Sequence, residues 1–370
     1  MKKVLLTGGG TAGHVTPNIA LLPGLKNAGF DILYVGSYEG MEKKLIEDQN
    51  IPYRGIATGK FRRYLSLKNL TDPFRVIKGY QEAKQIIREY KPDVLFSKGG
   101  FVSVPVVLAA GKYKVPVIIH ESDMTPGLAN KLCQSTASKI CCNFPETVNH
   151  LPAEKAVLTG SPIRRELLTG SREAGLAFTG LSGDRPILLM MGGSTGSRAV
   201  NTALRAILPQ LLKDFQVIHL CGKGNLDPTL DQPGYVQYEY ISAELKDLMA
   251  AADLVLSRAG ANAICELLAL KKPHILVPLS LIASRGDQIL NAESFKKQGF
   301  SYVLQEEKET ALKRGLSFVE QDELMNSETL LNAIHHVYKN RSQFIDAMEK
   351  SSQSDGVERI LQMIKEAAEK

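Results

Sequence analysis

Short apolar runs alternate with longer segments of helical periodicity along almost the whole 370-residue chain. The runs lie at 4–8, 31–36, 93–97, 115–121, 186–193, 215–222, 253–257 and 274–279. They lack apolar–polar alternation, which is typical of parallel strands that are buried on both faces. Because helical segments separate most of the runs, and because the chain is too long for one core, we expect an α/β protein of two doubly wound, Rossmann-like parallel-sheet domains.

An internal repeat supports two matching halves. The segment DVLFSKGGFVSVPVVLAAGKYKVP begins at Asp93, and the segment DLVLSRAGANAICELLALKKP begins at Asp253. In each, a strand is followed by a serine, a cation, a glycine-containing turn, a helix, and then Lys and Pro before the next strand. We therefore place the linker between the halves near residues 160–171 and the end of the second domain near Asn340.

The stretch GGGTAGH at residues 8–14 has the G-x-G-x-x-G spacing of dinucleotide-binding folds. Such sites hold the ribose with an acidic residue at the end of the second strand. Here that strand ends in Gly36 and Ser37, and Glu39 lies beyond it, so we do not expect NAD or FAD. The turn's amides and the helix dipole still favour an anion. His14 fits a packing or capping histidine, or a group that donates to a phosphate or takes a proton beside it.

Three further turns have the same character, at 97–103, 192–197 and 257–263. Each follows a predicted strand and opens a helix, which places it at the carboxyl ends of the strands, where ligands bind in open sheets. Four such turns in two halves predict an interdomain cleft with a phosphate-bearing ligand on each wall. Glu266 lies about one helical turn past the last of them, either within reach of a ribose or simply complementing the helix dipole.

No metal site is expected. The chain has no D-x-D motif, and its seven histidines show neither HxxxH nor HExxH spacing. A leaving diphosphate would then be stabilised by helix N-termini and by fixed cations such as Arg164. We therefore expect metal-independent chemistry without a cofactor.

Cysteine content and charge indicate the cellular compartment and a possible membrane contact. Five cysteines, an odd number without CxxC pairs, indicate a reducing compartment, and neither a signal peptide nor a membrane-spanning run is apparent. The net charge is +6, and the stretch from Arg54 to Lys91 holds ten Lys or Arg against three Asp or Glu. Within it, one helix face carries Leu70, Phe74, Ile77 and Tyr80. That face is either an ordinary core stripe or an apolar patch, ringed by cations, that sits on an anionic membrane.

Seven motifs together resemble the MurG family of bacterial glycosyltransferases, from the first strand to about residue 295. They are GGGTAGH, SKGGFVSVP, HESDMTPGLANK, GSPIRRE, GGSTGS, SRAGANAICE and SRGDQILNA. The resemblance implies a GT-B fold with domains at 1–163 and 164–341 and a C-terminal helix, 342–370, that returns to the first domain. It implies inverting transfer of N-acetylglucosamine from UDP-N-acetylglucosamine to the 4-hydroxyl of the muramoyl sugar of lipid I, which forms lipid II for peptidoglycan.

The resemblance also implies roles for residues. In the second domain, Arg164 and Ser194 would contact the diphosphate, Ile241 the uracil, Glu266 the ribose and Gln288 the sugar hydroxyls. The first-domain residues expected at the transferred sugar and the acceptor pyrophosphate are Thr11, Ala12, Gly13, His14, Gly99 and Gly100, with Asp123 as a further donor contact. His14 and Glu121 are both candidates for the general base, and the sequence does not choose between them.

A lipid-linked acceptor also bears on location and partners. We expect a peripheral protein on the cytoplasmic face of the cell membrane, seated on the face at 70–80. The expected partners are UDP-N-acetylglucosamine, lipid I and the anionic membrane surface, with cell-wall synthesis and division proteins as further candidates and no nucleic acid. The alternatives are another GT-B glycolipid transferase, such as a diacylglycerol glycosyltransferase, a UDP-N-acetylglucosamine epimerase, or a nucleotide-binding scaffold without turnover.

Overall fold

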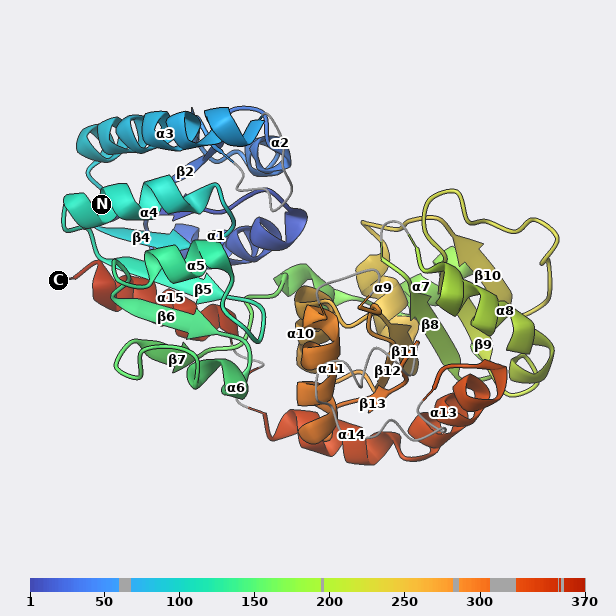
Figure 1. Cartoon of the computed structure of the whole chain (residues 1–370). Helices are drawn as coiled ribbons and strands as arrows, with labels where there is room; N and C mark the ends of the chain where they lie inside the picture. Colours follow the sequence, from blue (N-terminus) through green and yellow to red (C-terminus); the bar gives the residue numbers. More distant parts are fainter. Residues whose placement is uncertain are drawn as a thin grey trace. The chain divides into compact units, whose positions relative to one another are not determined.

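The chain forms two compact units in the computed structural model (Figure 1), which describes residues 1–59, 68–193, 196–281, 286–306, 324–351, 353 and 356–369. The first unit comprises Met1–Arg164 and Ser352–Lys370, and the second comprises Arg165–Ser351. We expected all of residues 342–370 to belong to the first domain. In the structure, α14 (Arg341–Glu349) stays with the second unit, because Phe344 packs against that unit's core.

In the described part of the first unit, seven parallel strands form a sheet in the order β3-β2-β1-β4-β5-β6-β7. The strands are β1 (Lys3–Thr7), β2 (Asp31–Ser37), β3 (Tyr53–Ile56), β4 (Val94–Ser97), β5 (Val117–Glu121), β6 (Lys139–Cys142) and β7 (Ala156–Leu158). The helical elements between them are η1 (Ala12–His14), α1 (Thr16–Asn27), α2 (Met41–Glu47), α3 (Lys68–Tyr90), α4 (Ser103–Lys112), α5 (Leu128–Cys133) and α6 (Pro145–Val148). The strand order reverses between β1 and β4, so the ligand-binding crevice of such a sheet falls at their carboxyl ends.

Apolar layers cover both faces of this sheet. On one face, Leu21 and Leu25 of α1 are buried in the same cluster as Ile360 and Ile364 of α15 (Gly356–Ala367). The two helices approach closely, because a side chain at Gly24 would collide with Leu361. The final helix is therefore part of the first unit's core, and α3, α4 and α5 lie on the opposite face (Figure 1).

The second unit repeats the plan. Among its described residues, six parallel strands follow the order β10-β9-β8-β11-β12-β13, with the reversal between β8 and β11. The strands are β8 (Ile187–Met191), β9 (Gln216–Leu220), β10 (Tyr235–Tyr238), β11 (Leu254–Ser257), β12 (His274–Leu276) and β13 (Tyr302–Val303). The helical elements are η2 (Arg165–Thr169), α7 (Arg172–Thr179), α8 (Arg198–Leu211), α9 (Leu245–Ala251), α10 (Ala261–Ala269), α11 (Asp287–Lys297), α13 (Ser327–Lys339) and α14. The fold is thus the expected pair of doubly wound α/β domains.

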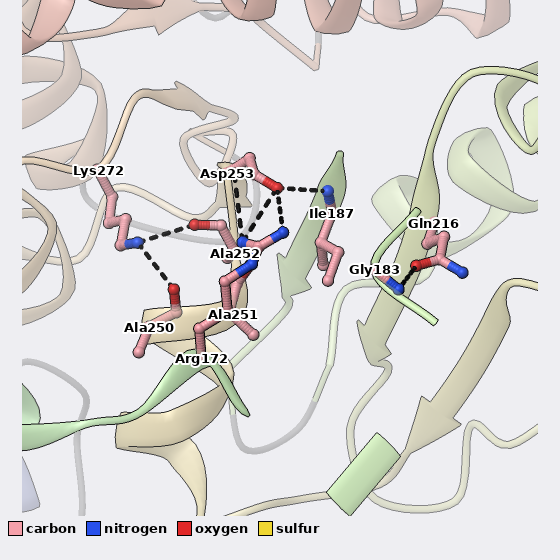
Figure 2. A network of polar contacts seen from close by, with 9 residues as sticks. All are labelled: Arg172, Gly183, Ile187, Gln216, Ala250, Ala251, Ala252, Asp253 and Lys272. Carbon is pink, nitrogen blue, oxygen red and sulfur yellow. Dashed lines mark hydrogen bonds and ion pairs between the residues drawn. The ribbon is translucent and has the colours of Figure 1, made fainter. Parts of the chain in front are cut away.

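The two aspartates that begin the internal repeat have equivalent roles. The Asp93 carboxylate accepts the backbone N–H of Lys3, the first residue of β1, over 2.7 Å. The Asp253 carboxylate accepts that of Ile187, the first residue of β8, over 2.9 Å, and Arg172 also donates to it (Figure 2). Both aspartates thus fasten the amino ends of the central strand pairs, which leaves the carboxyl ends to carry the glycine turns.

Candidate active site

The first glycine turn connects β1 to η1 and α1. Gly10 has a φ of +88°, which a residue with a side chain rarely adopts. Its N–H points to the carboxylate of Glu42 at 3.4 Å, so a protein side chain already occupies one of the amides that we expected to favour an anionic ligand. Glu42 is fully buried and also accepts the N–H of Ser37 over 3.0 Å. A protein carboxylate thus joins the turn to the end of β2, where a dinucleotide site would use an acid to hold the ribose.

His14 ends η1 beside this turn. Its Nδ1 lies 3.1 Å from Oγ1 of Thr11. Burial, followed by the positive charge of Lys98, lowers the pKa of His14 from 6.5 to about 4, although a backbone hydrogen bond with Gly9 and the charge of Glu42 act in the opposite direction. The imidazole is therefore neutral at pH 7 and able to accept a proton. Gly13 and Ala12 lie in the same short helix.

The second glycine turn packs directly on the first. Gly99 and Gly100 have φ values of +91° and +85°. A Cβ added to Gly100 would collide with the carbonyl oxygen of Gly9 and lie 3.1 Å from Nδ1 of His14. The two turns follow neighbouring strands, β1 and β4, and together form one surface at the carboxyl edge of the sheet. The structure thus brings the predicted acceptor-side glycines together with His14.

Glu121, the other candidate base, is committed to its own loop. It ends β5 and is buried. One carboxylate oxygen accepts the N–H of Asp123 at 3.0 Å, and the other accepts the N–H of Gly127 at 3.0 Å and Nδ2 of Asn130 at 2.8 Å. Three donors hold this carboxylate, which makes it the anchor of residues 122–130. Asp123 is half-buried in that loop.

Lys98 is a residue of this site that the sequence reasoning did not single out. It is fully buried directly after β4. Its ammonium donates to Nδ1 of His120 at 2.9 Å and also contacts the hydroxyl of Ser122. Nε2 of His120 then donates to the carbonyl of Gly160 at 3.0 Å. The internal repeat could have identified it, because a cation directly precedes the glycine turn in each half.

Arg258 is the matching cation of the second unit. One guanidinium nitrogen donates to Oγ of Ser197 at 2.7 Å and pairs with the carboxylate of Glu306 at 2.6 Å, and the other donates to the carbonyl of Val277 at 2.9 Å. Ser197 is the N-cap of α8, whose hydroxyl accepts the N–H of Val200. Arg258 therefore fixes the start of α8 against the ends of β11 and β12, where the donor-side turns lie.

The predicted donor contacts lie on segments that follow strands of the second sheet or adjoin them. Glu266 is half-buried on α10, and Ile241 lies between β10 and α9. The Oε1 atom of Gln288, at the start of α11, accepts the N–H of Leu279 at 3.2 Å. Arg164 was expected to begin the second domain but is instead the last residue of the first unit. Ser194 lies outside the described residues.

Two residues of the predicted membrane patch are exposed in the structure. Phe74 and Ile77 on α3 are 74% and 59% exposed, which is unusual for large apolar side chains in a helix that otherwise packs on a core. Tyr80 is instead half-buried and packs against the first unit's core, so its inclusion in an exposed patch was wrong. The side chain of Leu70 lies outside the described residues.

Two absences among the described residues bear on cofactors and membranes. No group of three or more His, Cys, Asp or Glu side chains in this part of the chain is placed to hold a metal ion. Within the same residues, no helix combines the length and the apolar character that crossing a bilayer requires.

Comparison with known proteins identifies the family. Residues 4–142 match the glycosyltransferase family 28 N-terminal domain, and residues 187–349 match the glycosyltransferase family 28 C-terminal domain. Proteins named UDP-N-acetylglucosamine–N-acetylmuramyl-(pentapeptide) pyrophosphoryl-undecaprenol N-acetylglucosamine transferase, from Lachnoclostridium phytofermentans and Lachnospira eligens, are 61% and 62% identical to this chain over 99% of both partners. The crystal structure of Acinetobacter baumannii MurG matches with a TM-score of 0.74 at 26% identity, covering 99% of this chain and 100% of that one. The chain therefore belongs to the MurG family of glycosyltransferases, in glycosyltransferase family 28, and has its two-domain GT-B fold.

Proposed function

We propose that this enzyme transfers N-acetylglucosamine, with inversion at the anomeric carbon, from UDP-N-acetylglucosamine to the 4-hydroxyl of the muramoyl sugar of lipid I, which yields lipid II. The observation that carries the proposal is near full-length identity above 60% to transferases whose names specify this donor sugar and a pyrophosphoryl-undecaprenol acceptor. The joined glycine turns around His14 supply a site of suitable chemistry: backbone amides near a phosphate and a neutral imidazole for the attacking hydroxyl.

His14 is the better candidate for the general base. The attacking hydroxyl must lose its proton as positive charge develops at the anomeric carbon. His14 is partly exposed and neutral at pH 7, whereas both oxygens of Glu121 already accept hydrogen bonds from its own loop. We assign Glu121 a positioning role, in which it holds residues 122–130 beside the acceptor turns.

The donor would bind the second unit and Arg164, the residue that directly precedes it in the chain. We propose that Arg164 and Ser194 contact its diphosphate, Ile241 its uracil, Glu266 its ribose and Gln288 its sugar. Transfer then requires the anomeric carbon of the bound donor to meet the acceptor's 4-hydroxyl. The leaving diphosphate would be stabilised by helix N-termini and cations rather than by a metal.

The decisive experiment is transfer of radiolabelled sugar from UDP-N-acetylglucosamine to a short-chain lipid I analogue, in excess chelator. We expect full activity without divalent ions, a loss of about 10²–10⁴ in kcat for His14→Ala, and a raised KM for the donor in Glu266→Ala. Transfer to diacylglycerol instead, or epimerisation without an acceptor, would establish one of the alternatives. Binding of the donor without turnover under these conditions would mean a scaffold.

The site of action follows from the acceptor. We propose that the enzyme works peripherally at the cytoplasmic face of the cell membrane, where Phe74 and Ile77 enter the headgroup region. Arg75 and Lys78, both exposed on the same turns of α3, would face anionic headgroups. Proteins of cell-wall synthesis and division are proposed as further partners.

A further inference from the structure

An apolar hollow lies in the first unit beside the acceptor-side turns. Its lining includes Phe101 and Val104 near the start of α4, Leu128, Ala129 and Leu132 on α5, and Val76 on α3. Val104 also packs against the core, so the floor of the hollow is part of the folded interior. Leu128 and Leu132 are exposed and form its rim.

The hollow lies at the same edge of the sheet as the glycine turns. The segments 98–103 and 122–128 each leave the carboxyl end of a strand, β4 or β5, and lead into α4 or α5. Phe101 is shared by both features, because a Cβ added to Gly10 of the first turn would lie 2.5 Å from Cε1 of its ring. One edge of the Phe101 ring therefore borders the turn that we assign to the acceptor pyrophosphate, and the same side chain lines the hollow.

The dimensions define what the hollow can hold. Its volume is about 160 Å³. An engineered apolar protein cavity of about 150 Å³ stays dry and binds one benzene molecule. A single isoprenyl unit is close to benzene in size and equally apolar. The hollow is too small for a long lipid chain, but it suits one unit of such a chain whose remainder leaves over the apolar rim.

We propose that this hollow binds an isoprenyl unit of the acceptor's polyprenyl chain close to the pyrophosphate. The inference rests on the proposed lipid-linked acceptor, and the relatives' names specify undecaprenol as its lipid. The chain leaves the pyrophosphate at the glycine turns, passes Phe101 and enters the hollow. It then crosses Leu128 and Leu132 toward the bilayer. The hollow thereby selects a prenyl chain and orients the headgroup before transfer.

The test compares acceptors that share the muramoyl-pentapeptide pyrophosphate headgroup but carry either a methyl group or two isoprenyl units, in detergent-free solution without membranes. The wild type should prefer the prenyl acceptor in kcat/KM by about ten-fold or more, the gain expected from burying a leucine-sized group. Ala129→Phe fills the hollow and should reduce this ratio to near one. Its KM for UDP-N-acetylglucosamine should stay unchanged, which also reports correct folding.

Two further variants sharpen the result. Ser135→Phe adds the same bulk at an exposed position beyond α5 and should keep the wild-type ratio. Val104→Thr is the alternative test in case Ala129→Phe does not fold. It preserves the shape of the hollow but makes its lining polar, and it should lower the ratio several-fold. A wild type that uses both acceptors equally, or an Ala129→Phe enzyme that keeps the preference, would overturn the proposal. If Ala129→Phe keeps the wild-type ratio of kcat/KM for the two acceptors but no longer binds anionic vesicles, the hollow contacts bilayer lipid instead. Absence of transfer to either acceptor would refute the proposed function itself.

Discussion

The ammonium of Lys98 donates to Nδ1 of His120 over 2.9 Å, and both side chains are fully buried. Because Nδ1 accepts, the ring proton is on Nε2, which donates to the carbonyl of Gly160. Gly160 has a φ of +74° and leaves no room for a side chain against residue Gln353. Two hydrogen bonds thus connect Lys98, beside the second glycine turn, to Gly160, close to the point where the chain passes into the second unit.

Lys98→Met should lower the free energy of unfolding by about 1–3 kcal/mol, because Nδ1 of His120 becomes a buried acceptor without its donor. A double-mutant cycle with His120→Phe isolates the interaction, and the two losses should not add. Urea unfolding at pH 7 measures all four proteins. A Met variant as stable as the wild type would mean that desolvation of the ammonium outweighs its hydrogen bonds.

Gly100→Ala should cost both stability and activity. The substitution forces an alanine to a φ of +85° and drives its Cβ into the carbonyl oxygen of Gly9 beside His14. We expect a loss of more than about 3 kcal/mol, since backbone strain and overpacking combine. Gly29→Ala is the matched control, because Gly29 has a φ of +74° but an added Cβ would meet no atom within 4 Å. It should cost only about 1–2 kcal/mol and leave transfer intact.

The sequence predicted the interior of each sheet better than its edges. All eight apolar runs form strands, because burial on both faces demands continuous Val, Ile and Leu. The strands that the sequence reading missed lie outside the central ones. β7 is only three residues long and half-buried throughout, and β10 begins Tyr-Val but continues with a glutamine. Short, partly exposed strands carry too few apolar residues to produce a pattern.

The candidate site shows a similar division. Few residues other than glycine tolerate a positive φ, so glycines in the sequence predict such turns, and Gly99 and Gly100 were identified in this way. Glu42 and Lys98 were not, because their burial depends on partners that are distant in the sequence: Gly10 for one and His120 for the other. Charged side chains are ordinarily exposed, so local sequence gives no reason to place these two in the interior.

His274 should make the protein sensitive to mild acid. It is fully buried, with Nδ1 donating to the carbonyl of Lys272 and Nε2 accepting from the hydroxyl of Ser301, both at 2.6 Å. Burial lowers the pKa of His274 from 6.5 to about 4. The unfolded chain therefore binds a proton at higher pH than the folded one, so stability is complete above pH 6.5 and is lost as the pH falls from 6.5 through 4. At pH 5, the low pKa of His274 lowers the free energy of unfolding by about 2 kcal/mol relative to pH 7.

The variant His274→Asn isolates this effect, since asparagine can still donate to Lys272 but does not titrate. The free energy of unfolding at pH 7 and pH 5 gives the acid-induced loss for each protein. We expect the loss to be smaller in the variant by about 2 kcal/mol. Equal losses would show that another group is responsible, and buried His219, whose pKa burial lowers to about 3, is the next to test.

Phe74→Asp combined with Ile77→Asp should abolish flotation with anionic vesicles while leaving transfer to a soluble acceptor unchanged. Both side chains are exposed, so neither substitution empties the core, and each aspartate adds charge that anionic lipids repel. Leu226→Asp is the control, an exposed apolar residue of the second unit, and it should float normally. Unchanged flotation of the double variant would place the membrane contact elsewhere.

The acid limb of the pH–rate profile should differ between kcat/KM and kcat. The first reports the free enzyme and the second the complex with substrate. In the free enzyme, burial and the charge of Lys98 hold the pKa of His14 at about 4, so kcat/KM should persist to nearly that pH. A bound pyrophosphate places negative charge beside the imidazole, offsets Lys98 and raises this pKa, so the limb of kcat should lie at higher pH. Lys98→Met should move both limbs to higher pH, because the lysine's charge lowers the pKa of His14 in the free enzyme and in the complex alike. Coincident limbs in the wild type would show that the acceptor pyrophosphate does not bind at the joined turns.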